Sequence, residues 1–204
     1  MRSLGRGACP ESYFCGGRYV ARFTEGVALM KALWTEPRVT FDGEFWQLQG
    51  APMEPKPFQK PFPPLWIGAS GPLALRRAVR LGNGFFGAGS TPTARFAEQV
   101  QVVRETLATE GVPATDFPIA KRVYVAIDED GGRARRRMND AMERLYGRRS
   151  ADIEAAAVAG TPADCVAALR EVVAAGAELI LFTAMFEQAE HAERLAAEVI
   201  PQLG

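Results

Sequence analysis

Short runs of bulky apolar residues alternate with amphipathic helical stripes along most of the chain. The runs begin near Leu65, Phe85, Val123 and Leu179, and apolar residues at helical spacing follow each one. Runs that lack alternating polar residues are typical of parallel strands buried on both faces. This alternation of strands and helices predicts an α/β fold with a parallel sheet and right-handed crossovers.

Two other elements are expected before the first of these runs. Residues 22–34 keep an apolar helical stripe, which predicts a helix. The apolar segments 39–41 and 45–48 flank the dipeptide Asp-Gly at 42–43, which is the strongest short-range signal for a β-hairpin. The proline-rich residues 53–64 then predict extended chain that leads into the sheet.

The later helices carry recognisable end signals. Thr91 and Pro92 predict the start of a helix that ends near Gly111. Thr161 predicts a capped helix start in the same way, and that helix is expected to end at Gly176. Between these two helices, residues 133–146 form a stripe rich in arginine, which is typical of a solvated helix face.

The number of strands sets the expected architecture. A closed (β/α)8 barrel needs eight strands and typically about 250 residues. This chain has 204 residues and supplies four clear strands, with a possible remnant of another near Leu4. We therefore expect one domain over residues 1–204, an incomplete barrel of the TIM type with a β-hairpin insertion.

Composition narrows the classes of partner and the compartment. Apolar residues make up 48% of the chain and charged residues 24%, which is ordinary for a soluble globular protein. Lysine plus arginine equals aspartate plus glutamate at 24 each, so no net electrostatic field favours binding to nucleic acid or to a membrane surface. Cys9, Cys15 and Cys165 lack a metal-binding spacing, and no long apolar run or signal peptide is recognisable. We expect reduced thiols and a cytoplasmic protein.

The best candidate for chemistry is the turn formed by Gly68, Ala69, Ser70 and Gly71, between an apolar run and a helix that begins at Pro72. Backbone N–H groups at a helix N-terminus lack intrahelical partners and lie at the positive end of the macrodipole. Small residues let a phosphate approach these groups, glycine tolerates positive φ, and the Ser70 hydroxyl could add a donor. The spacing matches neither the dinucleotide fingerprint nor the P-loop. A plain tight turn without a ligand therefore stays open.

No catalytic or metal-binding constellation is recognisable in the sequence. The single histidine, His191, is surrounded by charged residues and is expected on a helix surface. The tryptophans are interpreted as packing residues, and Cys9 and Cys15 as small loop or core residues.

Taken together, several segments resemble the luciferase-like monooxygenases, which use flavin or the deazaflavin coenzyme F-420 in a TIM-type barrel. The matching segments are, in chain order, GRG, RFTEGVALMKALWTEP, VTFDGEFWQL, PKPFQKPFPPLWIGASGP, LRRAVRLGNGFF and GTPADCVAALREVVAAGAELILF. Their order matches the C-terminal part of family members. The resemblance implies that the loop Gly68–Gly71 holds the cofactor phosphate through backbone amides. It also implies that Gly5 and Gly7 lie beside the same cofactor.

The resemblance further implies an oxidoreductase that uses FMN or coenzyme F-420. Such an enzyme oxygenates a small organic substrate or passes hydride to it. The first three strands of the family, which carry much of the ring and substrate surface, have no counterpart here. Two alternatives therefore stay open. One is a truncated, non-catalytic flavin-binding protein. The other is a barrel fragment that pairs its sheet edge with another copy or with a separate N-terminal half.

Overall fold

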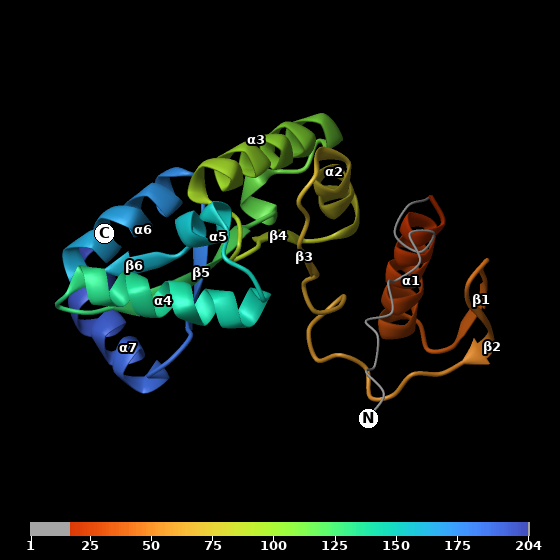
Figure 1. Ribbon diagram of the computed structural model, residues 1–204. Coiled ribbons are helices and arrows are strands. Elements are labelled where there is room, and N and C mark those ends of the chain that lie inside the picture. The colour runs from red at the N-terminus through yellow and green to blue at the C-terminus, as the bar shows by residue number, and fades with distance from the viewer. Residues whose placement is uncertain (1–16, 204) are drawn as a thin grey trace, which may run out of the picture. The chain divides into compact units, whose positions relative to one another are not determined.

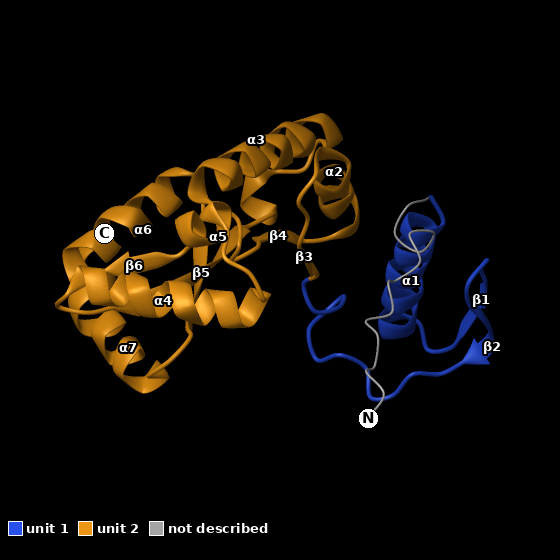
Figure 2. Ribbon diagram, viewed as in Figure 1, with its two compact units in different colours: residues 1–64 blue, residues 65–204 orange. Residues whose placement is uncertain are grey.

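The computed structural model describes residues 17–203, and its contacts divide the chain into two compact units, residues 1–64 and 65–204 (Figure 2). The possible strand near Leu4, together with Gly5 and Gly7, lies outside the described residues. That residues 1–204 make up one domain stays a prediction.

The first unit contains the expected helix and hairpin. Helix α1 (Gly17–Thr35) precedes the antiparallel strands β1 (Val39–Asp42) and β2 (Gln47–Ala51). The hairpin is confirmed, but its turn differs from the two-residue turn that Asp-Gly favours. Asp42 pairs with Gln47, so the connection spans the four residues 43–46.

Glu25 of α1 explains this wider connection. Its carboxylate accepts hydrogen bonds from the backbone N–H groups of Glu44, Phe45 and Trp46 at 3.0, 2.9 and 2.9 Å. A Cβ atom at Gly43 would collide with the same carboxylate. The glycine is thus needed for the close approach of Glu25, and the helix determines the shape of the turn.

The second unit holds a parallel sheet and its helices (Figure 1). Its five strands are β3 (Trp66–Ile67), β4 (Gly84–Gly87), β5 (Ile119–Ile127), β6 (Val158–Gly160) and β7 (Leu179–Ala184). Its α-helices are α2 (Pro72–Leu81), α3 (Thr93–Glu110), α4 (Gly131–Tyr146), α5 (Ala151–Ala156), α6 (Pro162–Ala174) and α7 (Gln188–Arg194). The remaining helical turns are η2 (Ala114–Asp116), η3 (Leu195–Val199) and η4 (Ile200–Gln202).

All four strands expected from the sequence are confirmed, and so is the α/β class. Strand β6 and helix α5 were not predicted, because three and six residues are too few to show a periodic pattern. Strand β3 pairs with β4, and β4 pairs with β5. Every pairing in this sheet is parallel, and within the described residues the sheet is open.

Strand β5 is the centre of the sheet. Ala120 pairs with both Phe86 and Leu179, and Val125 pairs with both Val158 and Ala184. A strand residue can face one partner on each side, so β7 lies along one edge of β5. Strand β4 lies beside the first part of the other edge, and β6 lies beside its last part.

Both faces of β5 are buried, which explains its unbroken apolar run. The larger core cluster contains odd-numbered residues of β5 with residues of α2, α3 and α6, among them Ile119, Val123, Val125, Leu75, Phe96, Val103 and Leu169. The smaller cluster contains even-numbered residues of β5 with residues of α4 and α5, namely Tyr124, Ala126, Ala134, Met138, Met142 and Ile153. Helices therefore cover β5 on both sides.

Most of the expected helix ends are confirmed. Thr161 accepts from the N–H of Asp164 at 3.3 Å, and the Asp164 carboxylate accepts from the N–H of Thr161 at 3.1 Å, a complete capping box. Gly111 and Gly176 have the left-handed φ of +67° and +102° expected after a helix. Helix α3, however, has Pro92 at its N-cap in place of Thr91.

Replacing Glu25 with alanine should destabilise the first unit by about 1–3 kcal/mol, because three backbone N–H groups lose a charged acceptor. Urea denaturation followed by tryptophan fluorescence measures this change, since Trp46 lies in the turn that Glu25 holds. Glu44→Ala is the control, because the Glu44 side chain is 60% exposed and pairs only at 3.6 Å with Arg18. Equal stability of both variants would show that Glu25 does not hold the turn.

Candidate functional site

The predicted loop, residues 68–71, connects β3 to α2 at the carboxyl end of the sheet. Gly68, Ser70 and Gly71 are exposed, whereas Ala69 packs against the larger core cluster. The loop is therefore anchored at one residue and open to solvent at the others. Ligands of open parallel sheets bind at this end of the strands.

The start of α2 offers unsatisfied donors. Gly71 is the N-cap residue, and the first intrahelical bond runs from the N–H of Leu75 to the carbonyl of Gly71 at 2.9 Å. Among the described residues, the N–H groups of Ala69, Ser70 and Gly71 have no hydrogen-bond partner. The first turn of α2 contains no acidic residue and no side-chain cap. These donors fit an anion such as a phosphate.

The two glycines are not required by their backbone conformation. Gly71 has an extended φ of −101°, and neither Gly68 nor Gly71 is among the described glycines with positive φ. Positive φ therefore does not explain these two glycines. A Cβ atom at Gly71 would meet nothing within 4 Å, and one at Gly68 would lie 3.4 Å from the carbonyl of Phe86. What Gly71 provides is open space in front of the donors.

Lys121 holds the neighbouring loop between β4 and α3. Its side chain is fully buried, and its ammonium donates to the carbonyls of Thr91 at 2.7 Å and Ala88 at 3.3 Å. The ammonium also lies 5.0 Å from the centre of the Phe96 ring. Burial lowers the pKa of Lys121 to about 8. Sequence reasoning missed this residue, although a lysine inside an apolar strand was the available signal.

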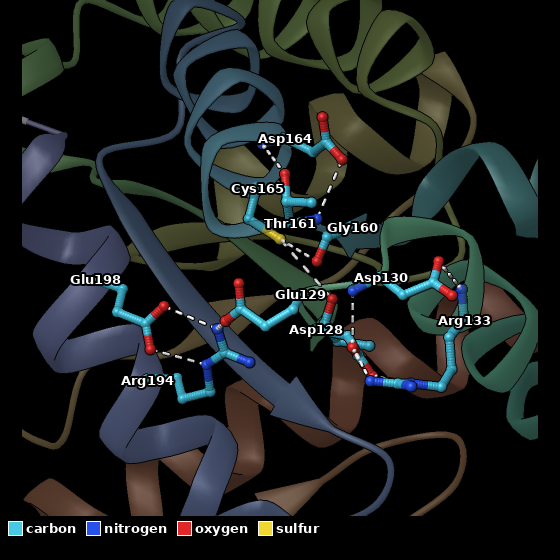
Figure 3. Close-up of polar contacts among 11 residues, drawn as sticks. Asp128, Glu129, Asp130, Arg133, Gly160, Thr161, Asp164, Cys165, Arg194 and Glu198 are labelled. Atoms are coloured by element: carbon cyan, nitrogen blue, oxygen red, sulfur yellow. Dashed lines mark hydrogen bonds and ion pairs between the residues drawn. The ribbon is translucent and has the colours of Figure 1, made fainter.

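Charged residues at the ends of β5 and β6 are already paired (Figure 3). Arg133 donates two hydrogen bonds, of 2.7 and 2.6 Å, to the Asp128 carboxylate, and these bonds lower the pKa of Asp128 to about 2. Arg194 donates to Glu129 at 2.6 Å and to Glu198 at 2.8 Å. This pairing indicates that these charged residues stabilise the helix ends.

The histidine and the cysteines considered in the sequence lie away from the loop 68–71 or outside the described residues. His191 is only 2% exposed, so its expected surface position is wrong. Its Nδ1 lies 3.1 Å from the carbonyl of Glu187, and its ring meets Phe186 edge to face. Cys165 is a buried free thiol, and burial raises its pKa to about 11. Cys9 and Cys15 lie outside the described residues, as do Gly5 and Gly7.

No group of three or more histidine, cysteine, aspartate or glutamate side chains in residues 17–203 could hold a metal ion. No helix in that range is both long enough and apolar enough to span a membrane.

Comparison with known proteins identifies the family. The family model of luciferase-like monooxygenases matches residues 16–179, and the chain belongs to this family. The F420-dependent glucose-6-phosphate dehydrogenase of Intrasporangium calvum is 34% identical over 115 residues. That match covers 56% of this chain and 34% of the dehydrogenase. The chain thus spans about a third of the length of this curated relative.

Solved structures show the same fold. Monooxygenase RslO1 from Streptomyces bottropensis has a TM-score of 0.78 and 25% identity, over 96% of this chain and 66% of that one. The coenzyme F420-dependent tetrahydromethanopterin reductase of Methanopyrus kandleri has a TM-score of 0.73 and 18% identity, over 90% and 63% of the two chains. These likenesses confirm the expected fold, an incomplete barrel of the TIM type.

The buried charge of Lys121 should make stability depend on pH. Its pKa of about 8 in the folded protein is below the ordinary 10.5, so the unfolded chain binds more protons between these values. The free energy of unfolding should therefore rise with pH. Relative to Lys121→Met, the wild type should gain on the order of 2 kcal/mol from pH 8 to pH 10.

Urea denaturation followed by circular dichroism at both pH values measures this gain. Lys60→Met, which removes an exposed lysine of the first unit, controls for the loss of a lysine charge elsewhere. Parallel pH profiles of the wild type and Lys121→Met would contradict the burial of a titrating ammonium.

Proposed function

We propose that the chain is a flavin- or F-420-dependent oxidoreductase of the luciferase-like class that binds the cofactor phosphate at Gly68, Ala69, Ser70 and Gly71. The observation that carries the proposal is the set of unpartnered N–H groups before α2, with open space in front of Gly71. The relatives support it, because the dehydrogenase and the reductase are both named as F420-dependent.

The bound cofactor would supply hydride transfer or oxygen activation, and the protein would supply binding, orientation and exclusion of water. In the described residues, the loop would hold the phosphate and Lys121 would fix the adjacent loop. The substrate would be a small organic molecule, which the family resemblance favours. Oxygenation of that substrate is the form of reaction we infer from the family description. The buried free thiol of Cys165 agrees with a cytoplasmic location.

A non-catalytic flavin-binding protein is the second candidate. The pairing of Asp128 with Arg133 and of Arg194 with Glu129 and Glu198 favours it, because these charges are already satisfied by one another. The chain would then bind the cofactor through the phosphate loop without turning over a substrate.

We also propose that the sheet associates with a further strand, supplied by another copy or by a separate N-terminal half. Strand β7 pairs only with β5 in the described part of the chain, which leaves its outer edge open. Leu179 and Leu181 on this strand are 53% and 51% exposed. An open edge with exposed leucines favours pairing with another strand.

Cofactor binding should depend mainly on the phosphate. FMN should bind more tightly than riboflavin by about a hundredfold or more, because two charge-assisted hydrogen bonds to the phosphate are each worth roughly 1.5–3 kcal/mol. Fluorescence titration with FMN, coenzyme F-420 and riboflavin measures the dissociation constants. Gly71→Val should weaken FMN binding, because its methyl groups fill the space before the donors.

The matched control is Ser150→Val, which places valine at the extended N-cap of α5. Both variants should stay folded, since N-cap replacements of this kind cost about 1 kcal/mol. Equal affinity for FMN and riboflavin would reject the phosphate site, and binding of neither FMN nor coenzyme F-420 would reject the proposed function of this chain.

The open edge should make the purified chain self-associate at micromolar concentration, which light scattering measures. Leu181→Lys should shift the distribution toward smaller species, because a charge on an edge strand disfavours pairing. Leu145→Lys on α4 is the control, since Leu145 is also 51% exposed but lies on a helix. A compact monomer of wild type would leave only the separate N-terminal half as the strand donor.

A further inference from the structure

Gln99 connects helix α3 to the loop 68–71. It is only 4% exposed, and its Nε2 atom donates to the carbonyl of Ser70 at 3.4 Å. The two residues are 29 positions apart, so the contact exists only because α3 packs beside the loop. Ser70 is itself exposed, and this contact ties its backbone to a buried side chain.

The other polar atom of the same amide is unsatisfied. Gln99 Oε1 is buried and has no hydrogen-bond partner among the described residues. The reverse orientation of the amide would place this oxygen against the Ser70 carbonyl, where two acceptors would repel each other. A buried amide with an unpartnered oxygen destabilises a fold, and an apolar side chain of similar shape would avoid that penalty.

The contact determines the direction of a backbone donor. In a planar trans peptide unit, the C=O of one residue and the N–H of the next point in opposite directions. Because Gln99 holds the carbonyl of Ser70 toward the buried side of the loop, the N–H of Gly71 must point away from it. Gly71 is exposed, and its surroundings are open.

We propose that Gln99 is a positioning residue that fixes the Ser70–Gly71 peptide so that the Gly71 N–H faces a bound phosphate. This inference rests on the proposed phosphate site and adds the residue that orients one of its donors. The proposed role also explains why a polar side chain occupies a buried position of α3. The amide orients the loop, although its burial destabilises the fold.

The test is the variant Gln99→Met, which keeps the length of the side chain and removes the amide. Its affinity for FMN should fall roughly three- to tenfold, as expected for the loss of one oriented hydrogen bond. Its affinity for riboflavin should not change, because riboflavin lacks the phosphate. Its thermal midpoint should stay equal to that of the wild type or rise, since the unpartnered oxygen is gone.

A second measurement needs no ligand. Hydrogen exchange in the free protein should be faster at the amides of Ala69, Ser70, Gly71 and Leu73 in Gln99→Met, because the Ser70–Gly71 peptide is no longer held. Gln99→Glu is a second variant of the same residue. When protonated, its carboxyl can donate to the Ser70 carbonyl and should restore the FMN affinity to that of the wild type at the same low pH. When ionised, it should repel both the carbonyl and the phosphate.

Thr106→Val is the matched control, because Thr106 is a buried polar residue of α3 whose hydroxyl bonds to Val102 within the helix at 2.6 Å. It should leave the ratio of FMN to riboflavin affinity unchanged. If wild type prefers FMN and Gln99→Met keeps the same preference and the same exchange rates, Gln99 has no positioning role and the phosphate site stands. If wild type shows no preference for FMN, the phosphate site fails together with the role of Gln99.

Discussion

The burial of β5 on both faces is the constraint on which the second unit depends. A strand covered by helices on each side must be apolar, and its backbone groups must find partners along both edges. Pairing with β4, β6 and β7 satisfies this requirement. Because all of these pairings are parallel, the carboxyl ends of the strands lie along one edge of the sheet. The loops that follow them are thereby held on a rigid support.

Two polar side chains inside this apolar support act on those loops. Lys121 of β5 donates to carbonyls of the loop after β4, and Gln99 of α3 donates to a carbonyl of the loop after β3. Each is almost completely buried, and burial of a charge or an amide is unfavourable unless its groups are paired. Both buried groups therefore lower the stability of the fold while they fix the conformation of a loop. Such a loss of stability is typical of functional sites.

Elsewhere along the same sheet edge, the charged side chains are paired with one another. Asp128, Arg133 and Arg194 have carboxylate or guanidinium partners at short distances. Thr161 and Asp164 cap the N-terminus of α6. These groups hold helix ends in place. The backbone donors before α2 differ from them, since they have no partners among the described residues. This contrast supports placing the ligand at the loop 68–71 within a chain of the luciferase-like family.

The sequence by itself determined the features that depend on neighbouring residues. The four principal strands, the parallel α/β class, the capping box at Thr161 and the left-handed glycines after α3 and α6 all follow from local patterns of side chains. The position of the candidate loop follows in the same way, from small residues between an apolar run and a helix start.

Tertiary structure decided what depends on partners far apart in the chain. The hairpin turn takes its shape from Glu25, 19 to 21 residues away, and Ser70 is held by Gln99, 29 residues away. His191 is buried against Phe186, although its neighbours in the sequence are charged. A pattern of residues reports local periodicity, whereas a hydrogen bond between distant segments exists only after packing has brought them together. For that reason the sequence indicated the loop, and only the fold identified the side chain that orients it.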